Sequence, residues 1–226
     1  MRLLVIEHQA DAPAGLVSGW AAGRGLAVTT LRPAAGQPLP RSLGPGDKVV
    51  VLGSEETAFD DSIPWLADEL TFVERALEND VAVLGICFGG QVLARLMGAR
   101  VYRLGEPEIG WVSVASQRAG LADGPWLAWH RDGFERPAGS HELAAGQVSL
   151  QAFSLGPHLG LQFHPEVNRP IVQAWIAGAD PPLDPLLAAR LLGDYDDAGE
   201  KAAANAETLF SAWLDGDFWA AGMPAG

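Results

Sequence analysis

Cys87 is the only cysteine among the 226 residues, and its surroundings are those of a nucleophile. The apolar run Val81–Ile86 before it predicts a buried strand, and the helical pattern of Gln91–Met97 follows it. Gly85–Gly89 has the thiol form of the G-x-S-x-G nucleophile elbow. Such a turn lifts the sulfur out of the sheet and places it at a helix N-terminus, whose partial positive charge favours the thiolate. Cys87 is therefore predicted to act as a nucleophile rather than as a buried apolar residue.

A second apolar run, Leu159–Phe163, ends on His164, Pro165 and Glu166. Proline favours an extended backbone at the residue before it, and residues two apart on an extended chain point the same way. Glu166 is thus placed to orient the imidazole of His164 and to stabilise its protonated form, as the acid of a catalytic triad does. A thiol, a base and an orienting acid suffice for attack on a carbonyl carbon through a covalent intermediate. No cysteine or histidine nearby completes a metal site, so no metal is expected.

The elements that must position these residues alternate along the first half of the chain. Strands are predicted at 2–8, 26–31, 48–52 and 81–86, and helices at 14–23, 62–77 and 91–97. Beyond residue 100 short strands follow, at 101–104, 111–115, 126–129, 148–153 and 159–163. The pattern predicts an α/β fold: an open, mostly parallel twisted sheet of the flavodoxin-like type, with helices on both faces and an antiparallel strand extension.

One domain, residues 1–226, is expected from the chain length and from a hydrophobic content of 48%. A catalytic core over about residues 1–178 should be followed by a C-terminal helical segment, residues 183–220. Within this segment the apolar stripe of a helix over 198–219 is interpreted as packing on the core. Its last residues, Phe218 and Trp219, could instead contact a second copy of the chain and form a homodimer.

The composition argues against several classes of partner. A formal net charge of −13 disfavours nucleic acid and anionic membrane surfaces. The apolar start Leu3–Ile6 is too short for a signal sequence or a membrane span. A single cysteine excludes an internal disulfide and fits a reducing cytoplasm.

Taken together, the motifs resemble those of the class I glutamine amidotransferase family, the Cys-His-Glu triad type. The likeness is to a stand-alone member similar to the amidotransferase domain of GMP synthase. Five segments carry it in the family's order: Gly53-Ser54 (oxyanion loop), Gly85–Gln91 (nucleophile motif), Glu106–Trp111 (E-x-G-W), Trp129–Phe134 (W-H-G-D-x-F) and Gln162–Glu166 (Q-F-H-P-E).

The resemblance implies that Cys87 attacks the side-chain amide of glutamine, which gives a γ-glutamyl thioester and ammonia. His164 would be the base and Glu166 the acid that holds it. The oxyanion and substrate-binding residues implied by the family motifs are Gly53, Ser54, Phe88, Gln91, His130 and Arg131. No cofactor is implied. The ammonia could feed a separate synthase, because the chain has no G-x-x-x-x-G-K-[ST] phosphate loop of its own.

Two residues depart from the family pattern, and two alternatives stay open. Gly90 stands where histidine is usual, and Arg131 replaces the glycine of W-H-G-D. Arg131 could narrow the pocket or meet a substrate carboxylate, or it could be a solvated arginine. Phe88 is similar to the C-F-G-H-Q form of plant γ-glutamyl peptidases, so a γ-glutamyl hydrolase or peptidase acting on a conjugate is the alternative enzyme. A non-catalytic regulatory protein that keeps the fold is the remaining alternative.

Overall fold

The computed structural model describes residues 1–44 and 46–218 of the chain. Its helices and strands are, in order, β1 (Arg2–Ile6), α1 (Leu16–Gly23), β2 (Ala27–Leu31), the short 3₁₀ helix η1 (Pro33–Ala35), β3 (Lys48–Val51), α2 (Leu66–Glu78), β4 (Val83–Ile86), α3 (Phe88–Leu96), β5 (Val101–Val112), β6 (Ala115–Ser116), β7 (Trp126–Phe134), β8 (His141–Ala145), β9 (Leu150–Leu155), β10 (His158–Leu161), α4 (Arg169–Gly178) and α5 (Pro185–Asp215). The sequence pattern predicts neither β6, β8 nor α4.

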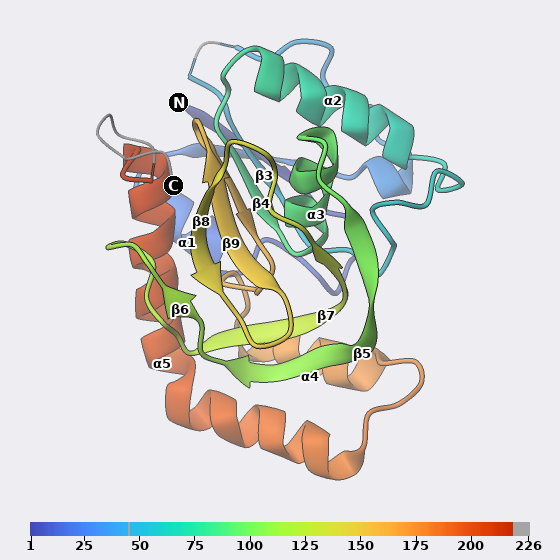
Figure 1. Ribbon diagram of the computed structural model, residues 1–226, viewed down its shortest axis with the longest axis vertical. Helices are drawn as coiled ribbons and strands as arrows, with labels where there is room; N and C mark the ends of the chain where they lie inside the picture. Colours follow the sequence, from blue (N-terminus) through green and yellow to red (C-terminus); the bar gives the residue numbers. More distant parts are fainter. Residues whose placement is uncertain (45, 219–226) are drawn as a thin grey trace.

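Eight strands of the described residues form a central sheet in the order β2-β1-β3-β4-β10-β9-β8-β6 (Figure 1). The first five of these run parallel, whereas β9, β8 and β6 each pair antiparallel with the preceding strand in this order. The predicted mostly parallel sheet with an antiparallel extension is confirmed. Parallel strands bring their carboxyl ends to one edge, where open α/β sheets bind ligands.

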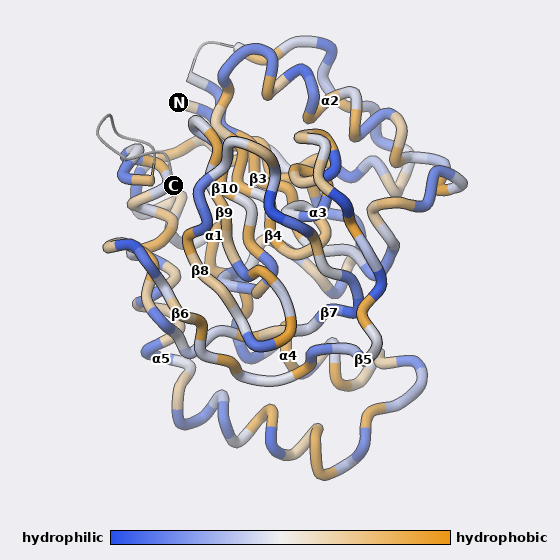
Figure 2. Tube along the Cα trace, viewed as in Figure 1, coloured by the Kyte–Doolittle hydropathy of each residue, from blue (hydrophilic) through white to orange (hydrophobic). Residues whose placement is uncertain are grey.

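Helices cover both faces of the sheet because the side chains of β1 alternate between two cores. Leu3 and Val5 belong to a buried cluster with α1 and the later part of α5, whereas Leu4 and Ile6 belong to a cluster with α2 and α3. Successive side chains of a strand point to opposite faces, so a parallel strand buried on both faces is apolar throughout. Figure 2 shows the apolar segments gathered in the central strands.

A separate two-stranded antiparallel sheet, formed by β5 and β7, brings two distant sequence motifs together. The prediction of two short strands at 101–104 and 111–115 is wrong, since β5 runs continuously from Val101 to Val112 with a register shift in its middle, and Ala115 belongs to β6. The pairing sets Glu108 opposite His130, and Ile109 opposite Trp129. The E-x-G-W and W-H-R-D-G-F segments therefore face one another.

Helix α5 is longer than its apolar stripe predicts, because it begins at Pro185 rather than at Ala198. The carboxylate of Asp184 accepts hydrogen bonds from two backbone N–H groups of the first turn, at 2.8 and 3.2 Å. Asp followed by Pro is a typical helix start, which an apolar stripe alone does not reveal. In Figure 1 the helix bends, so that its first part lies below β5 and its later part runs along the sheet. Trp219, predicted as the last helical residue, lies outside the described residues.

Two other helices begin at different residues from those predicted. Ser62 does not cap α2, which starts at Leu66; the Ser62 hydroxyl donates instead to Asp60, at 2.6 Å. Helix α3 starts at Phe88 and not at Gln91, because Cys87 is itself the residue before the first helical turn. The nucleophile candidate thus sits directly at the helix N-terminus.

Candidate active site

Cys87 occupies the sharp turn between β4 and α3 in a strained backbone conformation, with φ 53° and ψ −106°. Glycine is required on both sides of the turn. A side chain at Gly85 would collide with the backbone of Gly89, and one at Gly89 would collide with the Val51 carbonyl group. The positive φ of a non-glycine residue is typical of a functional site.

His164 comes three residues after the end of β10, the parallel neighbour of β4 in the sheet. Its backbone N–H donates to the Leu127 carbonyl at 2.8 Å, which fixes the chain at this point. Its ring Nδ1 lies 2.7 Å from Oε1 of Glu166, and both side chains are only 3% exposed. The geometry expected from the His-Pro-Glu spacing is therefore present.

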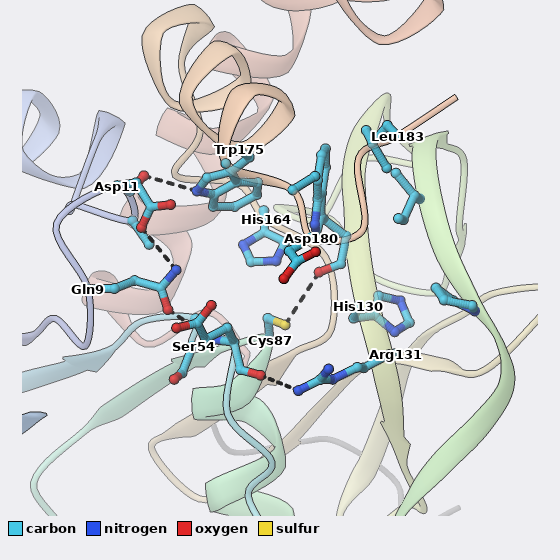
Figure 3. A pocket seen from close by; sticks show the side chains of 18 of the residues that line it. Gln9, Asp11, Ser54, Cys87, His130, Arg131, His164, Trp175, Asp180 and Leu183 are labelled. Atoms are coloured by element: carbon cyan, nitrogen blue, oxygen red, sulfur yellow. Dashed lines mark hydrogen bonds between the residues drawn. The ribbon is translucent and has the colours of Figure 1, made fainter. Parts of the chain in front are cut away.

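Cys87 and His164 meet at the carboxyl edge of the sheet and line the same cavity (Figure 3). Gly53, just after β3, lies against both: a Cβ atom at this position would lie 2.9 Å from Cε1 of His164 and 3.9 Å from Cβ of Cys87. The remaining ring nitrogen of His164, Nε2, is buried and has no hydrogen-bond partner among the described residues. A buried polar atom without a partner is costly unless a ligand or reacting group engages it.

The charge state of His164 follows from this environment. Burial lowers the pKa of His164, but the negative charges of Glu166 and Cys87 outweigh burial and raise it to about 10. The imidazole is thus a protonated imidazolium at neutral pH.

The loop after β3 and the first turn of α3 carry the other predicted oxyanion residues. Gly53 and Ser54 both line the cavity. The Phe88 side chain is fully buried against His8 and Trp65, so only its backbone N–H, at the start of α3, is available for an oxyanion. The first-turn N–H groups of a helix have no partner within the helix, which is why they suit this role.

Gln91 and His130 also line the cavity, and both are buried and held by backbone contacts. Nε2 of Gln91 donates to the Asp132 carbonyl at 3.2 Å. Nδ1 of His130 lies 3.0 Å from the same carbonyl, and its Nε2 lies 2.8 Å from Oε2 of Glu108 on the facing strand. The hydrogen bond from His130 lowers the pKa of the Glu108 carboxyl group.

Arg131 lies on β7 and not in a loop. Its guanidinium donates to the Glu55 carbonyl at 2.6 Å, across the mouth of the cavity that both residues line (Figure 3). The arginine that replaces a glycine of the family pattern thus ties β7 to the loop after β3. It occupies space at the entrance that a glycine would leave open.

Sequence reasoning missed several residues around the sulfur. Nε2 of Gln162 lies 3.7 Å from Sγ of Cys87, and the ring of Trp175 packs edge-on against His164 with the ring centroids 4.7 Å apart. The segment Gly178–Asp184, between α4 and α5, also lines the cavity. The Q-F-H-P-E motif already contained Gln162, whereas nothing in the sequence connects Trp175 or the loop with Cys87.

The described residues contain no group of three or more His, Cys, Asp and Glu side chains that could hold a metal ion. Within the same ranges, no helix combines the length and apolarity that crossing a membrane requires.

The fold and the site define an α/β protein with a nucleophile-elbow cysteine beside a His–Glu pair, and comparison with known proteins names the family. The family model for class-I glutamine amidotransferases matches residues 44–170, more than half of the chain. This chain belongs to the class I glutamine amidotransferase family.

Individual relatives agree with this assignment. The chain is 30% identical over 146 residues to YfeJ of Salmonella typhimurium, named as glutamine amidotransferase-like, covering 58% of this chain and 61% of YfeJ. It is 29% identical over 150 residues to γ-glutamyl peptidase 5 of Arabidopsis thaliana, covering 60% and 59% of the two chains. Over 117 residues it is 33% identical to a glutamine-hydrolysing GMP synthase subunit of Ignicoccus hospitalis, covering 47% and 62%. The matched regions thus span about three fifths of each relative's length.

The crystal structure of a glutamine amidotransferase from Thermotoga maritima superposes with a TM-score of 0.85 at 27% identity. The superposition covers 95% of this chain and 98% of that one. The structural similarity therefore extends well beyond the residues 44–170 that the family model matches.

Proposed function

We propose that this protein is a cysteine-dependent glutaminase that releases ammonia from the side-chain amide of glutamine. One observation carries the proposal: the buried Nε2 of His164 has no partner among the described residues and lies in the same cavity as the elbow cysteine, while Nδ1 is held by Glu166. This is the arrangement that a proton donor to a leaving amine needs.

The proposed reaction has two halves. The Cys87 thiolate attacks the amide carbon, a C–S bond forms, and the carbonyl electrons move to the oxygen. When that oxyanion collapses, the C–N bond breaks, and Nε2 of His164 gives its proton to the departing ammonia. Neutral His164 then takes a proton from water, whose oxygen attacks the thioester; collapse of the second oxyanion breaks the C–S bond and yields glutamate and the thiolate.

The oxyanion formed in both halves needs preorganised donors. The proposed donors are the backbone N–H of Phe88, in the first turn of α3, and those of Gly53 and Ser54, which follow β3 and line the cavity together with Cys87. Donors of this type lower the barrier by about 3–4 kcal/mol each. Gln91 and His130 are proposed to contact the substrate from the β7 side of the cavity.

A second candidate, hydrolysis of a larger γ-glutamyl conjugate, is favoured by the size of the site. The cavity measures about 670 Å³, well within the range of sites that hold drug-sized ligands. The Arabidopsis relative is by name a γ-glutamyl peptidase. The chemistry at Cys87 would be unchanged, with an amine leaving in place of ammonia.

If the protein releases ammonia from glutamine, a separate synthase is proposed as the partner that uses this ammonia. The Ignicoccus relative is by name one part of a glutamine-hydrolysing synthase. The single cysteine supports a cytoplasmic location, because a reducing compartment does not favour disulfide bonds. Helix α5 packs against both α1 and α4, which supports a single amidotransferase domain.

The test compares kcat/KM for glutamine with kcat/KM for a γ-glutamyl dipeptide, and traps the thioester by mass spectrometry. A γ-glutamyl adduct on Cys87 is expected, and Cys87→Ala should lower turnover by at least about 10⁴-fold while the protein remains folded. His164→Ala should be nearly as severe and Glu166→Ala milder. Retained turnover in Cys87→Ala would remove the nucleophile assignment. If the wild-type protein releases no amine from either substrate and iodoacetamide leaves Cys87 unmodified, the non-catalytic alternative holds.

A further inference from the structure

A further buried histidine–carboxylate pair, outside the triad and distinct from His130 and Glu108, contacts the loop after β3. His8, just after β1, is 1% exposed, and Glu69 of α2 is completely buried. Nε2 of His8 lies 3.1 and 3.0 Å from the two carboxylate oxygens of Glu69. Burying an ion pair costs several kcal/mol of desolvation free energy per ion. The desolvation cost suggests that the His8–Glu69 pair has a function other than stabilising the fold.

The other ring nitrogen of His8 reaches the loop that carries the oxyanion donors. Nδ1 lies 2.9 Å from the carbonyl oxygen of Gly53. A carbonyl oxygen and a carboxylate are both acceptors, so both ring nitrogens of His8 donate and the ring is an imidazolium. Burial lowers the pKa of His8, but the charge and hydrogen bond of Glu69 outweigh it and raise the pKa overall.

Packing fixes the position of this imidazolium. The ring stacks on Trp65 with the centroids 4.9 Å apart, and it meets the edge of Phe88 at the same distance. Phe88 is the residue that follows Cys87. His8 thus contacts both residues whose peptide groups would stabilise the oxyanion, Gly53 and Phe88. It does not itself line the cavity.

The consequence lies in the orientation of one peptide group. The Gly53–Ser54 peptide is trans, and in a trans peptide the C=O and N–H groups point in opposite directions. The Gly53 C=O points to His8, which does not line the cavity, so the N–H of Ser54 points away from His8, and Ser54 itself lines the cavity. Glycine has unusual backbone freedom, so without this anchor the peptide could rotate and turn a carbonyl oxygen toward the reaction centre.

We infer that His8, held by Glu69, is a positioning residue that locks the Gly53–Ser54 peptide with its N–H directed at the oxyanion. The hydrogen bond to the carbonyl also polarises this peptide and strengthens its N–H as a donor. The inference rests on the proposed amide hydrolysis, and it makes the His8–Glu69 pair part of the machinery for transition-state stabilisation.

The decisive variant replaces both partners with apolar groups of similar size, His8→Phe together with Glu69→Leu. Replacing a buried ion pair as a whole is often neutral for stability, whereas removing one partner leaves a buried charge. The double variant should fold, keep the packing against Trp65, and lose the anchor on Gly53. For glutamine, kcat should fall about 10²-fold with KM within twofold of wild type, as expected for a contact made only in the transition state.

Two inhibitors separate this role from a general structural one. The aldehyde analogue of glutamine, in which CHO replaces the side-chain amide, adds to Cys87 and forms an oxyanion-like hemithioacetal. Iodoacetamide alkylates the same sulfur without forming any oxyanion. The double variant should bind the aldehyde about 10²-fold more weakly, in step with kcat, and should be alkylated at the wild-type rate.

Two further variants serve as rescue and control. His8→Gln retains an amide N–H that can reach the Gly53 carbonyl, and it should recover part of kcat. Arg2→Met removes a charged pair with Asp47 at the other ends of the same strands, β1 and β3, and should leave kcat unchanged.

The outcomes are distinguishable. An active wild type whose double variant keeps full kcat, or loses alkylation in proportion to kcat, overturns the inference alone. A wild type inactive on every γ-glutamyl substrate overturns the proposed function and the inference with it.

Discussion

At the scale of single residues, the chemistry depends on a histidine whose proton is held by two negative neighbours. Glu166 and Cys87 raise the pKa of His164 to about 10 despite complete burial. In the proposed reaction, His164 therefore carries the proton that the departing ammonia receives, throughout the physiological pH range.

This environment predicts the alkaline limb of the pH profile. For the wild-type protein, kcat/KM should stay level above neutral pH and fall only as the pH rises through about 10, where His164 loses its proton. Glu166→Gln removes one of the charges that raise this pKa, so the limb should move to lower pH by about 1–3 units. The measurement is kcat/KM for glutamine across pH 6 to about 11, with His158→Gln as a control that should leave the limb in place. An unchanged limb in Glu166→Gln would show that Glu166 does not set the pKa of His164.

At the scale of elements, close packing of α3 on its neighbouring strands explains a residue that departs from the family pattern. A side chain at Gly90 would collide with the carbonyl group of Leu161 at the end of β10. The histidine usual at this position cannot be accommodated unless α3 or β10 moves. The same closeness holds the first turn of α3 against the segment that leads to His164.

Gly90→Ala should therefore destabilise the protein even though alanine favours helices. We expect a loss of about 1–3 kcal/mol in the free energy of unfolding, since an added methyl group forces the backbone of two elements apart. Gly193→Ala is the matched control: it is a helical glycine of α5 with no atom within 4 Å of an added Cβ. This control should gain about 0.5–1 kcal/mol. Urea denaturation measures both, and a stabilised Gly90→Ala protein would contradict the packing argument.

At the scale of the whole molecule, stability toward acid depends in part on a histidine far from the chemistry. His158 begins β10 and is buried in the sheet, with its Nδ1 lacking a partner among the described residues. Burial, together with the positive charge of Lys48, lowers its pKa to about 4 against the opposing effect of Asp80. The folded protein therefore keeps this imidazole neutral at pH values where the unfolded chain protonates it.

The sign of the effect on stability follows from linkage. The unfolded chain binds the proton below about pH 6.5 and the folded protein only below about pH 4. Stability from this residue is thus fully present above pH 6.5 and is lost as the pH falls toward 4, by up to about 3 kcal/mol. His158→Leu should lose less stability than wild type between pH 7 and 4.5 in urea denaturation. Parallel losses in the two proteins would show that His158 does not contribute.

The sequence predicts the local parts of this molecule well because short-range physics determines them. The apolar run before Cys87, with glycines on both sides, allows little besides a strand, a tight turn and a helix. Proline after His164 and a carboxylate two residues on likewise determine a local geometry, which the structure has. The continuous course of β5 and the early start of α5 were not predicted, because tertiary pairing and a single capping residue override the apolar pattern there.

By itself, then, the sequence determined the family, the type of sheet and the candidate nucleophile, base and acid, since each rests on spacing within a few residues. Only the tertiary structure decided that His8 and Glu69 meet behind Gly53, that Arg131 bridges to Glu55, and that the segment 178–184 forms a wall of the cavity. These contacts join residues far apart in the chain. These contacts form only when several helices and strands pack together, so no local pattern of residue types predicts them.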